Sequence, residues 1–146
     1  MWSIVEWIQS NPAVVVVVAL LVYRMVSSSR PFPEAGGCVK SIHSGSEFDA
    51  ELAKGIVVAD FYATWCPPCR TAAPIYGALS NEFDATFLKV DVDECRDLAR
   101  REGISAMPSF KFYEDAKCVR SLQGFQQTAL IKALDDLGVP RKQKAS

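Results

Sequence analysis

The sequence has little of what several large function classes need. It contains a single histidine, His43, which excludes most histidine-based catalysis. Lys and Arg number 16 against 17 Asp and Glu, so the formal net charge is −1 and gives no support for a nucleic-acid-binding surface. About half of the 146 residues are apolar, which suffices for the core of about one domain and makes a disordered chain unexpected.

Cysteines are few and irregularly spaced. Their number, five, is odd and too small for a disulfide framework, and only Cys66 and Cys69 have a spacing that indicates chemistry. A Cys-x-x-Cys pair can also hold zinc, but a structural zinc site needs four ligands, and the sequence has no second such pair and no pair of histidines. We therefore expect no metal. We interpret Cys38, Cys95 and Cys118 as small apolar residues, with Cys95, near a helix start, as a candidate regulatory thiol.

The first 26 residues differ from the rest in composition. They contain an unbroken apolar run, Ala13–Tyr23 (AVVVVVALLVY), which follows an Asn-Pro pair suited to a helix start. The 11 residues up to Asn11 carry no Lys or Arg, which disfavours a cleaved signal peptide, whereas Arg24 and Arg30 follow the run. We predict that residues 1–26 form a single-pass transmembrane anchor, and the positive-inside rule then places the rest of the chain in the cytosol. The run is short for a spanning helix, so a cleaved signal and a non-membrane element stay open.

Composition divides the remainder into three parts. Residues 27–37 (SSSRPFPEAGG) are rich in serine, proline and glycine, which is typical of a linker. Residues 38–138 carry the patterns of strands and helices and form the predicted folded domain. Residues 139–146 end in a short basic tail.

The folded domain is predicted to alternate strands and helices in the order β-α-β-α-β-α-β-β-α. A capping box, Ser44–Glu47, opens the first helix, and Asp93 is expected to cap the third, which runs through about Arg101. The second strand, Ile56–Tyr62, is apolar except for Asp60, a pattern typical of a central strand buried on both faces. The order predicts an α/β fold with a central mixed sheet flanked by helices.

The Cys-Pro-Pro-Cys segment lies where this buried strand passes into the second helix. The Cys66 sulfur therefore faces the unsatisfied N–H groups of the helix N-terminus, whose dipole stabilises a thiolate. Pro67 and Pro68 fit the first turn, where no N–H partner is needed. Cys69 follows one turn later, close enough to form a disulfide and more sheltered. The pattern predicts Cys66 as the attacking thiol and Cys69 as the resolving thiol.

Several segments resemble the thioredoxin family in the same order along the chain. They are residues 60–70 (DFYATWCPPCR), Pro74, 87–93 (FLKVDVD), 106–110 (AMPSF) and Gly124, and the resemblance covers about Val39–Leu137. Thioredoxins usually have glycine in place of Pro67. The Trp-Cys-Pro-Pro-Cys form is typical of tryparedoxins, the trypanothione-linked branch, so a tryparedoxin-like variant stays open. The resemblance implies the thioredoxin fold, preceded in this chain by the predicted N-terminal transmembrane helix.

The resemblance implies roles for two residues near the cysteines. Asp60 becomes the buried acid/base that takes the proton from Cys69, although a structural hydrogen bond would also explain a buried aspartate. Lys89 matches the lysine that accompanies that acid in some thioredoxins, with an exposed strand lysine as the alternative.

Other matched positions imply a substrate-facing surface. Trp65 forms a wall over the site, although it could also be a core residue. Met107–Pro108 implies a cis peptide bond beside the disulfide, where the Met107 backbone pairs with an extended substrate segment. Gly124 leaves room for that substrate backbone.

Together these features predict a membrane-tethered thiol–disulfide oxidoreductase that reduces protein disulfides. It would bind no cofactor, its redox group being the Cys66–Cys69 disulfide. The resemblance implies thioredoxin reductase with NADPH, or trypanothione, as electron donor, and oxidised proteins such as peroxiredoxins as substrates. Two alternatives stay open. One is a lumenal oxidase or isomerase, if the anchor points the other way. The other is a non-catalytic thioredoxin-fold scaffold, which would not need intact Cys66, Cys69, Asp60 and Pro108.

Overall fold

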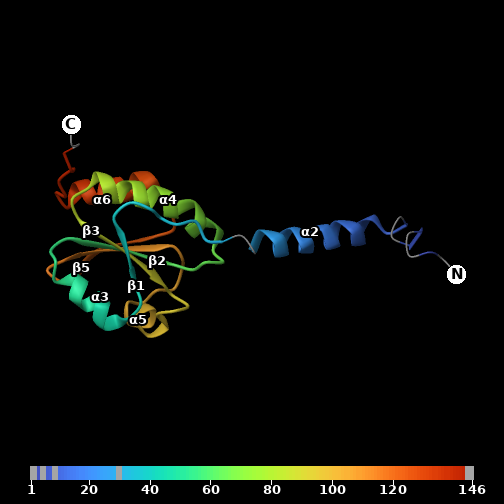
Figure 1. Cartoon of the computed structure of the whole chain (residues 1–146), viewed down its shortest axis with the longest axis horizontal. Coiled ribbons are helices and arrows are strands. Elements are labelled where there is room, and N and C mark those ends of the chain that lie inside the picture. The colour runs from blue at the N-terminus through green and yellow to red at the C-terminus, as the bar shows by residue number, and fades with distance from the viewer. Residues whose placement is uncertain (1–2, 4–5, 8–9, 29–30, 144–146) are drawn as a thin grey trace. The chain divides into compact units, whose positions relative to one another are not determined.

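The computed structural model describes residues 3, 6–7, 10–28 and 31–143. The chain divides into two compact units, Met1–Pro31 and Phe32–Ser146. Figure 1 shows a helix in the first unit and an α/β domain in the second. The folded domain therefore starts before the predicted boundary at residue 38, because the second half of the predicted linker belongs to it.

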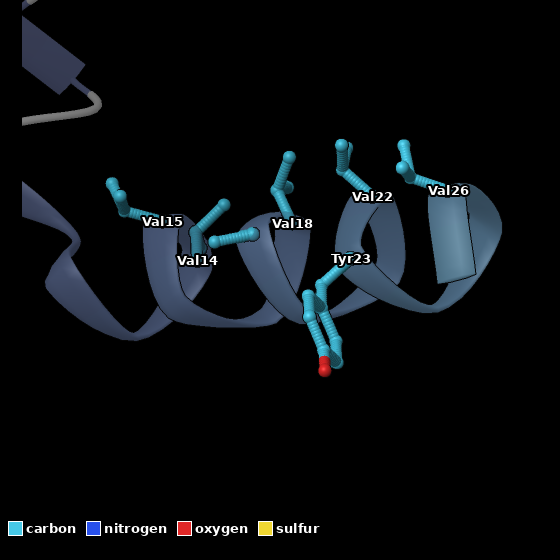
Figure 2. Close-up of a pocket in the computed structure, with 7 residues that line it drawn as sticks. Val14, Val15, Val18, Val22, Tyr23 and Val26 are labelled. Atoms are coloured by element: carbon cyan, nitrogen blue, oxygen red, sulfur yellow. The ribbon is translucent and has the colours of Figure 1, made fainter.

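The first unit is built on α2 (Pro12–Ser28), which begins at the proline of the Asn-Pro pair, as predicted. Large apolar side chains are exposed along the helix. Those that line up along one side in Figure 2 are Val15, Val18, Val22 and Val26. A helix whose whole circumference is hydrophobic is usually buried, either in a protein core or in a membrane.

The predicted transmembrane helix is not found. In the described part of the chain, no helix is both long enough and apolar enough to cross a membrane. Length gives the physical reason, since α2 has 17 residues. At about 1.5 Å per residue these span about 26 Å, against about 30 Å of hydrocarbon. The apolar part of α2 is shorter still, because Arg24 and two terminal serines occupy its last turns.

Five strands form one mixed sheet in the second unit. They are β1 (Val39–Ile42), β2 (Val57–Tyr62), β3 (Thr86–Asp91), β4 (Ser109–Glu114) and β5 (Lys117–Gln123). Their order across the sheet is β1-β3-β2-β4-β5, with β1, β3 and β2 parallel and β4 and β5 antiparallel to their neighbours. The central strand β2 is buried over nearly its whole length, as its continuous apolar pattern predicted.

Helices cover both faces of this sheet (Figure 1). They are α3 (Gly45–Leu52), α4 (Pro67–Glu82), α5 (Arg96–Arg101) and α6 (Gln127–Asp136). On the face of α4 and α6, Tyr76 shares a core cluster with Val58. On the face of α3 and α5, Phe48 shares a second cluster with Ala59. Because strand side chains alternate between faces, Asp60 lies on the same face as Val58, under α4. The predicted element order and the α/β fold with a mixed sheet flanked by helices are confirmed.

The N-termini of α3 and α5 show which of the two predicted N-caps form. Ser44 caps α3, because its Oγ accepts a hydrogen bond from the Glu47 N–H at 3.2 Å, as predicted. Asp93 does not cap α5, whose N-cap is Cys95. The Asp93 carboxylate accepts a hydrogen bond from the Trp65 indole instead. The prediction for Asp93 is wrong because an acidic residue near a helix start gives the same local signal whether it caps the helix or binds a distant side chain.

The first residues of the predicted C-terminal tail are structured. The Asp84 N–H donates to the Pro140 carbonyl at 2.8 Å, and the Lys142 N–H donates to the Glu82 carbonyl at 2.7 Å. Residues 139–142 are thereby fastened to the end of α4.

Candidate active site

The two cysteines of the Cys-Pro-Pro-Cys segment form a disulfide at the N-terminus of α4, with their Cα atoms 5.3 Å apart. Cys66 is the N-cap, and its Sγ accepts a hydrogen bond from the Cys69 N–H at 3.4 Å. Pro67 and Pro68 occupy the first turn, where their missing N–H groups leave nothing unpaired. The Cys66 sulfur thus lies at the positive end of the helix dipole, which stabilises a thiolate once the disulfide is reduced.

The two cysteines differ in solvent access. Cys66 is 4% exposed and Cys69 is 0% exposed. Both pack in a small cluster with Ala63. Cys66 is therefore the sulfur that an incoming group meets first, and Cys69 is sheltered beneath it.

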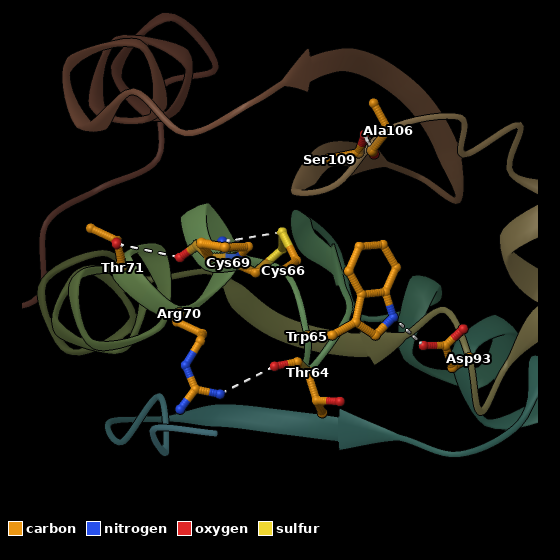
Figure 3. The surroundings of a disulfide bond; sticks show 10 residues. Thr64, Trp65, Cys66, Cys69, Arg70, Thr71, Asp93, Ala106 and Ser109 are labelled. Carbon is orange, nitrogen blue, oxygen red and sulfur yellow. Dashed lines mark hydrogen bonds between the residues drawn. A yellow bond between two sulfur atoms is a disulfide. The ribbon is translucent and has the colours of Figure 1, made fainter. Parts of the chain in front are cut away.

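Trp65 stands at the rim of the site, beside Cys66 (Figure 3). Its side chain is 62% exposed, and its Nε1 donates to Asp93 Oδ2 at 2.8 Å. An indole that is open to solvent is not part of the core, so the core alternative for Trp65 is wrong. Asp93 was not predicted as its partner, because the two residues are 28 positions apart and no local signal connects them.

The turn before β4 carries the expected cis peptide bond, between Met107 and Pro108. The Ser109 hydroxyl donates to the Ala106 carbonyl at 2.7 Å (Figure 3). The Gly124 N–H donates to the Pro108 carbonyl at 2.8 Å, which ties the end of β5 to this turn. The φ of Gly124 is +77°, and nothing described lies within 4 Å of where a Cβ would stand. Glycine therefore suits both the backbone conformation and the open space beside the turn.

Asp60 is a buried acid. Its side chain is 3% exposed, and its Oδ1 has no hydrogen-bond partner in the described part of the chain. Burial raises the pKa of the Asp60 carboxyl to about 8, and the Lys89 ammonium lowers it only in part. For Oδ1, the alternative of a structural hydrogen bond is wrong. A carboxyl with a pKa near the working pH is suited to accept and return a proton.

Lys89 lies beside Asp60 in the sheet, because the two residues are register partners in the parallel pair of β2 and β3. The Lys89 side chain is only 15% exposed, and its Nζ lies 3.3 Å from Glu34 Oε2. The alternative of a freely exposed strand lysine is therefore wrong. Glu34 was not predicted as a partner of Lys89, because it falls in the predicted linker.

Comparison with known proteins agrees with this geometry. A family model described as thioredoxin matches residues 39–136. The chain belongs to the thioredoxin family. It is a thioredoxin-type protein-disulfide reductase whose redox group is the Cys66–Cys69 disulfide. The non-catalytic scaffold is therefore no longer a candidate.

Individual thioredoxins match over nearly their whole length. Thioredoxin-2 of Saccharomyces cerevisiae is 40% identical over 99 residues, which cover 66% of this chain and 95% of that protein. A thioredoxin H-type of Chlamydomonas reinhardtii is 45% identical over 106 residues, or 68% of this chain and 93% of the relative. The solved structure of Plasmodium falciparum thioredoxin superposes with a TM-score of 0.63 at 35% identity, covering 66% of this chain and 97% of that one.

Residues Phe32–Gly37, hereafter the strap, precede the part that matches the thioredoxin family. The Phe32 ring lies 4.8 Å from the Tyr62 ring, and the Arg70 guanidinium lies 5.7 Å from the centre of the Phe32 ring. Ala35 is buried. The strap therefore packs on the domain next to the redox site, contrary to the prediction of a linker throughout residues 27–37. The available signal was a phenylalanine between two prolines, an apolar side chain that needs cover.

The other cysteines of this thioredoxin-family chain are free thiols that take no part in the disulfide. Cys95 is buried, its thiol faces the Ile42 carbonyl at 3.6 Å, and burial raises its pKa. A redox-sensing thiol needs a lowered pKa and access, so the structure argues against Cys95 as a regulatory residue. Cys38 and Cys118 are exposed free thiols.

Proposed function

We propose that this reductase works by a dithiol–disulfide cycle in which Cys66 attacks and Cys69 resolves. The difference between the two sulfurs carries the proposal. Cys66 caps α4 and is the more accessible, whereas Cys69 is completely buried. The positive end of the α4 dipole stabilises a thiolate, so Cys66 is the sulfur that attacks.

In the reducing direction, the dithiol passes two electrons to a substrate disulfide. The Cys66 thiolate attacks one substrate sulfur, which forms a mixed disulfide and releases the other sulfur as a thiolate that solvent protonates. Asp60, as the carboxylate, takes the proton of the Cys69 thiol. The Cys69 thiolate then attacks Cys66 Sγ, so that the enzyme disulfide forms and the second substrate sulfur leaves as a thiolate.

Trp65, Met107, Pro108 and Gly124 form the proposed substrate-binding surface around Cys66. The exposed indole, the turn at the cis bond and the open space beside Gly124 support this assignment. An extended substrate segment would pair with the Met107 backbone, and Trp65 would cover its flank.

Single-cysteine variants test the cycle. Cys66→Ser should abolish reduction of insulin disulfides with dithiothreitol, because no thiolate remains at the helix N-terminus. Cys69→Ser should retain attack and trap substrates as mixed disulfides, which non-reducing electrophoresis detects. Trapping by Cys66→Ser but not by Cys69→Ser would reverse the assigned roles.

Thioredoxin reductase with NADPH is the proposed electron donor, and oxidised proteins such as peroxiredoxins are the proposed substrates. The identity to thioredoxins of several organisms supports this choice. Pro67 supports a second candidate, trypanothione, because the Trp-Cys-Pro-Pro-Cys form is typical of tryparedoxins. NADPH consumption, measured in parallel with thioredoxin reductase and with trypanothione and its reductase, decides between the donors.

The first unit supports a separate proposal, attachment of the chain to a membrane. The large apolar side chains of α2 are between 36% and 70% exposed, and an exposed apolar surface of that extent is typical of an interaction site. The catalytic domain would then face the cytosol, with the lumenal oxidase or isomerase as the alternative.

A further inference from the structure

The strap is fixed along the helix that carries the disulfide. At Gly77 of α4, a Cβ would lie 1.6 Å from the Ala35 carbonyl oxygen, so the two backbones are in direct contact. Where the strap ends, the Cys38 N–H donates to Ser80 Oγ at 2.8 Å. The strap thus belongs to the catalytic unit, although it lies outside the residues that match the family.

The first residues of the strap reach the redox site. Phe32 packs on Tyr62 and borders the small cluster that contains both redox cysteines. Two positions further on, the Glu34 carboxylate lies 3.3 Å from the Lys89 ammonium. The strap therefore contacts the site at two points, one apolar and one charged.

Lys89 joins the strap to the buried acid. It is the register partner of Asp60. Because its side chain is only 15% exposed, surrounding atoms restrict where the ammonium can lie. The ammonium favours the charged form of Asp60. The exposed carboxylate of Glu34 is its ion-pair partner.

We propose that Glu34 is a positioning residue of the redox reaction, which holds the Lys89 ammonium outward and so limits its contact with Asp60. Docking of the strap then sets how readily Asp60 exchanges its proton. The inference rests on the proposed acid/base role of Asp60 for its functional consequence, but not for the effect of Glu34 on Asp60.

The titratable groups that interact with Asp60, besides Lys89, are Tyr62 on β2 and Tyr76 from α4. After reduction, the proposed cycle adds the Cys69 thiol. Burial raises the pKa of both tyrosines, that of Tyr62 to about 12, so both stay neutral in the working range. The Lys89 ammonium is the charge that acts on Asp60.

The test follows the protonation of Asp60 in the oxidised full-length protein. Its carboxyl ¹³C shift is recorded by NMR from about pH 5 to about pH 10, with Asp60→Asn to assign the signal. Glu34→Gln releases Lys89 toward Asp60, so the midpoint should fall from about 8 by about half a pH unit, the size expected for an exposed ion pair. Glu114→Gln removes another exposed carboxylate and should leave the midpoint unchanged.

A double-mutant cycle tests whether Glu34 acts on Asp60 through Lys89. Lys89→Met should raise the midpoint, and Glu34→Gln added to Lys89→Met should change nothing further. A midpoint that Glu34→Gln leaves unchanged, or lowers equally with and without Lys89, would overturn the proposal. If Glu34→Gln moves the midpoint while the rate of disulfide reduction is flat across that pH range, the positioning by Glu34 stands and the acid/base role of Asp60 fails.

Discussion

Asp60 lowers the stability of the folded protein as the pH rises. Its pKa in the folded state is about 8, against 3.8 for an ordinary aspartate. Between about pH 4 and pH 8 the unfolded chain has lost this proton and the folded chain still binds it. The unfolded state therefore binds fewer protons, and the free energy of unfolding falls with increasing pH through this window. Each pKa unit corresponds to about 1.4 kcal/mol.

Asp60→Asn should remove this decrease in the free energy of unfolding with pH, because an amide of the same shape has no charged form. The variant should match the parent near pH 4 and exceed its free energy of unfolding by a few kcal/mol near pH 8. Urea denaturation of the oxidised proteins at both pH values measures the difference. The same variant should slow disulfide reduction near neutral pH by about tenfold or more. Equal stabilities near pH 8 would contradict the raised pKa.

Most residues of the candidate site lie in short sequence motifs, which is why they could be proposed from the sequence. Cys66 and Cys69 follow from their spacing at a strand–helix junction, and Asp60 follows from one acid in an apolar strand. Glu34 did not follow, because it meets Lys89 across 55 positions in sequence. A contact of that separation depends on the register of β2 and β3 and on where the strap crosses α4, neither of which local patterns encode.

Among the helices and strands, α4 makes a direct backbone contact with the strap, which lies outside the family match. Alanine stabilises a helix interior by about 1 kcal/mol relative to glycine. At Gly77 this gain is opposed, because a Cβ would also stand 2.5 Å from the Ala35 carbonyl carbon. The atoms that the Cβ would meet belong to the backbone of Ala35, so no flexible side chain can move aside to relieve the clash.

Gly77→Ala should therefore displace the strap and destabilise the full chain. In a chain that begins at Cys38, the same substitution should stabilise by about 1 kcal/mol, because the opposing carbonyl is gone. Chemical denaturation of the four proteins measures both effects. A stability change of the same sign in both backgrounds would contradict the contact between the strap and α4.

The elements themselves were predictable for a physical reason. In β2, continuous burial imposes a continuous apolar sequence, and in α3 the cap Ser44 acts within one turn. The length of α2 was not predictable from composition, since apolar residues continue on both sides of its central run. The predicted linker failed in part because proline and glycine specify backbone conformation, not whether a segment packs on its neighbours.

At the scale of the whole molecule, attachment and catalysis are assigned to different units. The first unit ends at Pro31, and every residue of the site lies in the second. The exposed apolar side chains of α2, in the first unit, are the proposed membrane contact.

Removing residues 1–31 should abolish co-flotation with phosphatidylcholine vesicles and leave insulin reduction unchanged. A full-length control with Val18→Asp and Val22→Asp should lose flotation in the same way, because charges on the apolar side of α2 oppose burial in lipid. Full-length protein that stays in the aqueous fraction would contradict attachment. Protection of the domain from protease in sealed vesicles would favour the lumenal alternative.

The segments on both sides of the part that matches the family are fastened to α4, the strap at Gly77 and the tail at Glu82. A fusion partner or affinity tag placed close to either point would therefore disturb the contacts of the helix that presents the Cys66 sulfur. The same arrangement offers a reporter. Cys38 is an exposed free thiol where the strap ends, and a fluorophore on it, in oxidised protein with Cys118→Ser, would signal when the strap leaves the helix.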